Sequence, residues 1–66
     1  MWIRSPQGTL WREAGQYAAT VWYRGGRGWR FVVEWEGRQV AYREGLPDEA
    51  AAMGAADMVL AGLVQP

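Results

Sequence analysis

The chain has 66 residues and a formal net charge of zero, and it contains five Trp but neither Cys nor His. A chain of this length has room for one hydrophobic core, so we expect residues 1–66 to form a single domain. The missing ligands exclude disulfides, haem and zinc sites, and we expect neither a metal nor a cofactor. Aromatic side chains, which bury about 150–250 Å² each, take the place of such cross-links.

No segment of the sequence is typical of a membrane or secreted protein. No apolar run reaches the roughly 18 residues of a membrane span, and the first residues lack the charged and apolar regions of a signal peptide. We therefore expect a soluble, cytoplasmic protein, and the lack of Cys agrees with that location.

The beginning of the chain predicts a hairpin. The segment Ser5-Pro6-Gln7-Gly8 has Pro and Gly at the positions that a β-turn favours. This turn folds a strand of about residues 1–4 onto a strand of about residues 9–13. The expected cross-strand pairs are Ile3 with Leu10 and Trp2 with Trp11.

A third strand of about residues 17–24 follows the reversal at Ala14-Gly15, because this segment is rich in Val, Thr and aromatic residues. It leads into the loop Gly25-Gly26-Arg27-Gly28, whose length sets the register with the next strand. A four-residue loop places Trp22 on the core face of the sheet, and a five-residue loop places the neighbours of Trp22 there instead. The sequence is compatible with both.

The next hairpin joins strands of about residues 29–35 and 38–43 through Glu36-Gly37, a two-residue loop that ends in Gly. The hydrophobic alternation and the register of this turn agree. On one face the expected pairs are Val33 with Val40 and Phe31 with Tyr42, beside Trp29 and Trp35. On the other face they are Arg30 with Arg43, Val32 with Ala41, and Glu34 with Gln39.

Pro47-Asp48-Glu49 predicts the start of a helix of about residues 47–63, since Pro fits the first turn and carboxylates there complement the helix dipole. The first half of this helix is rich in Ala, so it can lie close against the sheet, with Gly54 as an expected contact. The fold class is therefore α+β: an antiparallel meander sheet of four or five strands packed against one C-terminal helix. The expected apolar stripe of the helix consists of Met53, Ala56, Leu60 and Leu63.

Charge is unevenly distributed along the chain. Residues 1–43 carry all seven Arg and three acidic residues, whereas residues 44–66 carry four acidic residues and no basic one. The sequence thus offers two candidate surfaces for a partner. The basic surface consists of Arg24, Arg27, Arg30 and Arg43, with Glu34 as a neighbour that can neutralise part of it. The acidic surface consists of Glu44, Asp48, Glu49 and Asp57, which also favour the helix dipole and solubility.

The residue types disfavour catalysis. Without His, Cys or Lys, the available bases and nucleophiles are carboxylates and hydroxyls. Glu34 and Glu36 point the same way on a strand, and we interpret them as a solvated strand edge. We therefore expect no enzyme and assign no catalytic residue.

The aromatic residues exceed what one small core can hold. Trp29, Phe31 and Trp35 share the face expected under the helix. Trp2, Trp11 and Trp22 cannot all join them, which predicts an exposed aromatic patch of the kind that marks an interface.

In size, composition and sheet-plus-helix plan, the whole chain resembles the small phage-encoded anti-CRISPR proteins that act on type I surveillance complexes. The resemblance includes no diagnostic motif, and it assigns no functional residue. It implies a non-enzymatic, stoichiometric protein–protein inhibitor in the cytoplasm of a bacterial host. Such an inhibitor binds a subunit of the complex and blocks recognition of target DNA.

A second resemblance concerns residues 29–62, where a hairpin with alternating Arg precedes an Ala-rich helix. This segment is similar to the three-stranded sheet-plus-helix arm domains of phage integrases, and it implies a DNA-binding module. Arg24, Arg30 and Arg43 are the matching strand positions. The zero net charge departs from that family, because an excess of Lys and Arg provides affinity for DNA. An accessory or antitoxin-like domain of a small operon has the same plan.

Overall fold

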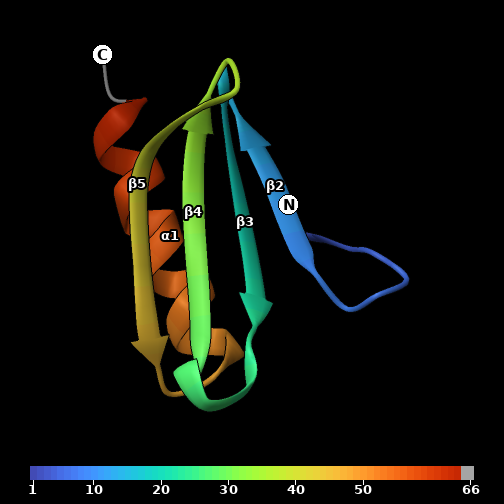
Figure 1. Cartoon of the computed structure of the whole chain (residues 1–66). Helices are drawn as coiled ribbons and strands as arrows, with labels where there is room; N and C mark the ends of the chain where they lie inside the picture. Colours follow the sequence, from blue (N-terminus) through green and yellow to red (C-terminus); the bar gives the residue numbers. More distant parts are fainter. Residues whose placement is uncertain (65–66) are drawn as a thin grey trace.

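The structure is a computed structural model that describes residues 1–64, and it contains one five-stranded sheet and one α-helix. Each strand pairs antiparallel with its neighbour in the chain, and the helix lies on one side of the sheet (Figure 1). The predicted α+β class, a meander with a C-terminal helix, is confirmed. The elements are β1 (Ile3–Arg4), β2 (Leu10–Ala14), β3 (Tyr17–Tyr23), the 3-10 turn η1 (Gly25–Arg27), β4 (Trp29–Trp35), β5 (Arg38–Leu46) and α1 (Glu49–Leu63).

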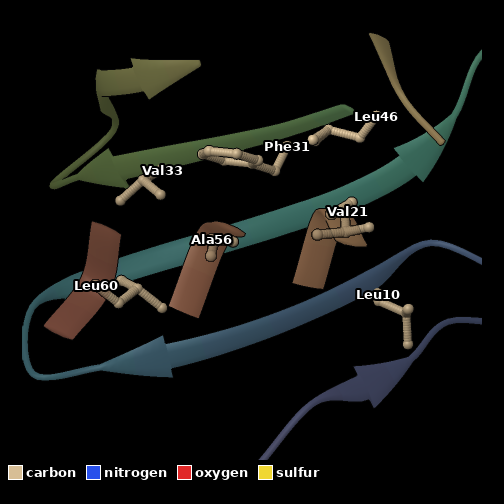
Figure 2. Close-up of a cluster of buried hydrophobic side chains, with 9 residues drawn as sticks. Leu10, Val21, Phe31, Val33, Leu46, Ala56 and Leu60 are labelled. Carbon is tan, nitrogen blue, oxygen red and sulfur yellow. The ribbon is translucent and has the colours of Figure 1, made fainter. Parts of the chain in front are cut away.

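The core lies between α1 and the sheet (Figure 2). On the helix, Ala52 and Ala56 are both 0 % exposed. Because these side chains are small, α1 can approach the middle strands closely, and Leu60 then fills the space one turn further along. The buried apolar residues are Leu10, Ala19, Val21, Phe31, Val33, Leu46, Ala52, Ala56 and Leu60.

The helix begins close to the predicted position. Asp48 is the N-cap, and its Oδ1 accepts a hydrogen bond from the N–H of Ala51 at 2.8 Å. This bond satisfies one of the donors that the first turn of a helix leaves free. Pro47 lies just before the cap and not in the first helical turn as expected, and it has no N–H with which to continue the preceding strand.

The buried stripe of the helix differs from the expected one. Ala52 is buried in place of Met53, which is only partly buried against the core, and Leu63 is 38 % exposed. A Cβ at Gly54 would meet no atom within 4 Å. The expected close contact at Gly54 is therefore wrong, because this residue lies on the solvent side of α1.

The first hairpin contains the predicted turn in a shifted register. The N–H of Gly8 donates to the carbonyl of Ser5 at 2.9 Å. The N–H of Ser5 donates to the carbonyl of Thr9 at 2.8 Å, so the loop is one residue longer than expected. Gly8 ends this loop with a φ of 90°, a conformation that such a longer hairpin loop requires. The two expected pairs of this hairpin are therefore wrong. The observed pairs are Ile3 with Trp11 and Arg4 with Leu10.

The loop between β3 and β4 has the longer of the two lengths that the sequence allowed. Tyr23 lies opposite Trp29, so residues 24–28 form the connection. This register places Val21, which is 0 % exposed, on the core face. Trp22 therefore points to the opposite side of the sheet.

The hairpin of β4 and β5 has the predicted turn, followed by a bulge. Glu36 and Gly37 have φ values of 49° and 80°, as a tight two-residue turn requires. The predicted pair of Glu34 with Gln39 is confirmed. The next pair is Val33 with Ala41, so Val40 is an extra residue on β5. The expected pairs Val33 with Val40, Phe31 with Tyr42, Val32 with Ala41 and Arg30 with Arg43 are consequently wrong.

A second irregularity lies near the end of β5. Phe31 pairs with Arg43, and Trp29 pairs with Leu46, so β5 holds one residue more than β4 between these pairs. Gly45 has a φ of 80°, which permits the local change of direction. As a result Leu46 points into the core and is 8 % exposed.

We expect opposite effects from two substitutions on the helix. Ala56→Leu should lower the free energy of unfolding by about 1–3 kcal/mol, because the close contact with the sheet leaves no room for a larger side chain. Gly54→Ala should raise it by up to about 1 kcal/mol, because Gly is a poor helix former and the added methyl meets open space. Urea unfolding followed by Trp fluorescence measures both, and a stabilising Ala56→Leu would contradict the packing.

Candidate functional site

The sheet has one face that α1 does not cover, which we call the outer face. Figure 1 views the sheet from this side, with α1 behind it, and no segment among residues 1–64 crosses the face. Because side chains alternate along a strand, residues next to the buried ones point outward. The outer face consists of Ile3, Trp11, Glu13, Ala18, Thr20, Trp22, Arg30, Val32, Glu34, Gln39, Tyr42 and Glu44.

An aromatic and apolar row crosses the middle of the outer face. Strand pairing places its members side by side on all five strands, in the order Ile3, Trp11, Thr20, Val32 and Tyr42. Ile3 is 49 % exposed, Trp11 is 37 % exposed and Tyr42 is 43 % exposed. We call these five residues the apolar row.

The expectation that the tryptophans exceed the core agrees with where they lie. Trp11 and Trp22 are on the outer face, the second beside the apolar row. Trp2 packs against the core instead, and its indole N–H donates to Oδ2 of Asp57 at 3.4 Å. The exposed aromatic surface is therefore built from β2, β3 and β5.

Arg30 is the best-buried charged residue of the outer face, at 6 % exposure. Its guanidinium lies between two rings, 5.5 Å from the centroid of Trp22 and 5.7 Å from that of Tyr42. Its Nη2 donates to Oε2 of Glu44 at 3.2 Å, and the hydroxyl of Tyr42 donates to the same oxygen at 3.1 Å. Arg30 thus fixes the orientation of both rings, and cation–π attraction contributes to that hold.

The predicted basic surface is divided between the two sides of the sheet. Arg43 pairs with Phe31 on the side of α1, whereas Arg30 is on the outer face. Arg27 reaches Oε1 of Glu44 at 3.5 Å, and Arg24 is exposed at the end of β3. The bulge at Val40 causes the separation, because a shift of one residue moves a side chain to the other face.

The predicted acidic surface is largely engaged within the fold. Glu49 accepts two hydrogen bonds from the guanidinium of Arg4, at 3.1 and 2.8 Å, and Asp57 accepts one from Arg12 at 2.7 Å. The hydrogen bond and the charge of Glu49 raise the pKa of Arg4. Asp48 caps the helix and Glu44 holds Arg30. Because basic residues precede acidic ones in the chain, ion pairs form between the first strands and α1.

Two carboxylates on the outer face remain free of ion pairs within residues 1–64. Glu13 and Glu34 lie in one row on either side of Ala18. Sequence reasoning did not select Glu13, although its position two residues after Trp11 on β2 places both on one face. Arg24 and Arg27 lie at the opposite end of β3, about 20 Å away at the usual rise per strand residue.

Comparisons with protein families, with curated proteins and with solved structures found no match to this chain. Among residues 1–64, no group of acidic side chains is placed so that it could hold a metal ion. The one helix of the described residues is too short to cross a membrane.

Two substitutions test the role of Arg30. Arg30→Ala should lower the free energy of unfolding by about 2–4 kcal/mol, because it removes buried methylenes and two cation–π contacts. Glu44→Gln should change it by less than about 1 kcal/mol, because this carboxylate is solvent-exposed. Thermal and urea unfolding measure both values. Equal losses in the two variants would show that the ion pair, and not the stacking, holds Arg30.

Proposed function

We propose that this protein is a non-enzymatic, stoichiometric binding protein that docks onto a protein partner through the outer face. The observation that carries the proposal is the uncovered apolar row beside Trp22. Trp, Tyr and Arg are the residues that most often dominate binding energy at protein interfaces. Here all three types lie on one face, and Arg30 holds two of the rings in fixed orientations. A rigid aromatic surface loses little conformational entropy on binding.

The most specific form of the proposal is an inhibitor of a type I CRISPR surveillance complex, acting in the cytoplasm of a bacterial host. It would bind a subunit of the complex and block recognition of target DNA. This form rests on the resemblance in size, composition and plan to phage-encoded anti-CRISPR proteins. The outer face adds a surface of suitable character for a subunit to contact.

Direct binding of nucleic acid is the second candidate. Exposed aromatic side chains on an open sheet can stack against bases, and Trp11 and Tyr42 are exposed in this way. The charges of the outer face oppose it, because Glu13 and Glu34 make no ion pair with any residue from 1 to 64 and Arg30 is engaged by Glu44. The integrase-like mode also needs Arg30 and Arg43 on one side of the sheet, and they lie on opposite sides.

Two measurements on the purified protein separate these functions. A pull-down with a type I complex tests the inhibitor, and retardation of random duplex and single-stranded DNA at low salt tests nucleic-acid binding. Retention of one complex subunit without DNA retardation supports the proposal. DNA retardation that weakens steeply with salt supports the second candidate. If neither occurs, the assignment to a type I complex and the nucleic-acid alternative both fail.

Trp11→Ala should weaken binding of the protein partner by at least about 30-fold, the equivalent of a 2 kcal/mol hot spot. The control is Met58→Ala, since Met58 is 78 % exposed on α1, on the other side of the molecule. This control should leave the affinity unchanged. Surface plasmon resonance with the isolated subunit measures both affinities. A loss of binding in the Met58 variant with none in the Trp11 variant would place the partner on the helix.

A further inference from the structure

We propose that a second copy of this chain covers the outer face when the partner is absent. The inference rests on the proposed function, because it concerns the regulation of the same face. Two copies would pack their outer faces together, with the α1 helices outside, and binding of the partner would require this dimer to separate. Sheets commonly pack face to face in this way, about 10 Å apart with their strands nearly aligned.

The first argument is the polarity of charge along the strands. One end of the outer face carries Glu13 and Glu34, which make no ion pair within residues 1–64. Arg24 and Arg27 lie beside the other end of this face, in the connection between β3 and β4. Within residues 1–64, Arg27 pairs with Glu44 at the long distance of 3.5 Å and Arg24 makes no ion pair. A face with one acidic and one basic end is complementary to itself when one copy is turned end over end.

This polarity selects one of the two symmetric arrangements. A two-fold axis parallel to the strands would place Glu34 over the same acidic end of the second copy, which is unfavourable. A two-fold axis perpendicular to the strands reverses their direction and places Glu34 over the end that carries Arg24 and Arg27. Closed two-fold dimers of this kind are the commonest oligomers of soluble proteins. Charge complementarity therefore fixes the axis.

The second argument is the size of the side chains along β3. Outward-pointing residues on this strand are Ala18, Thr20 and Trp22, so small side chains precede a large one. A two-fold axis that crosses β3 at Val21 brings Thr20 of one copy over Trp22 of the other. A small residue then faces a large one near the axis, as close packing of two faces requires. The exposed ring of Trp11 becomes covered in the same arrangement.

A pair of charge-swapped chains tests the arrangement. The first carries Glu13→Arg with Glu34→Arg, and the second carries Arg24→Glu with Arg27→Glu. Each swapped chain by itself carries charges of one sign at both ends of the outer face. Its dimerisation should therefore be at least about tenfold weaker than that of the unmodified chain. An equal mixture should form the dimer again, because each acidic end then meets a basic one. Analytical ultracentrifugation over a wide range of concentration at low salt measures all four samples.

Circular dichroism must show that each swapped chain is folded. The control is the double variant Glu36→Arg with Arg43→Glu, which alters charges off the outer face and keeps the net charge at zero. If a swapped chain does not fold, Glu34→Gln replaces it and should weaken the dimer, whereas Glu36→Gln should not. A strictly monomeric unmodified chain overturns the inference, as does a dimer that both swapped chains retain. If Trp11→Ala still weakens partner binding in that case, the proposed function stands alone. If Trp11→Ala affects neither the dimer nor the partner, both fail.

Discussion

A single helix can cover only one face of a five-stranded sheet, and this limit determines the rest of the structure. The chain uses its helix on the side where Ala52 and Ala56 lie against the middle strands. The outer face must then be ordered by its own side chains, without a second layer. Arg30 provides that order, because its guanidinium lies between two rings while Glu44 holds it from the edge. The same contacts that stabilise the uncovered face also make it a rigid surface for another protein.

The distribution of charge has a structural purpose before it has a functional one. The pairs of Arg4 with Glu49 and Arg12 with Asp57 connect the early strands to the helix that follows much later in the chain. Pairs of this kind are partly exposed and contribute little stability singly, so the buried face of the helix sets its position and the pairs add to it. They also engage Glu49 and Asp57, two of the four acidic residues in the second half of the chain. What remains for recognition is the smaller set of charges at the two ends of the outer face.

The sequence was sufficient for features that depend on neighbouring residues. The turn at Glu36-Gly37 and the helix start follow from local backbone preferences; the turn lies where expected, and the helix begins two residues after the expected Pro47. Cross-strand register was harder, because Gly8, Val40 and Gly45 each insert a residue and each insertion exchanges the faces of the sheet. Nothing local marks Val40 as a bulge. The candidate site depended on that register, which is why the expected basic patch divided and the arginine held between two rings was not foreseen.

The meander topology has a consequence during synthesis on the ribosome. Every strand pairs with the strand made just before it, so hairpins can form in sequence as the chain emerges, with little loss of loop entropy. The helix of residues 49–63 is made after all of them. Until the helix leaves the exit tunnel, Phe31 and Val33 are exposed to water, and the nascent sheet has two faces with exposed apolar side chains instead of one. Slow translation of that last segment would therefore favour aggregation over folding.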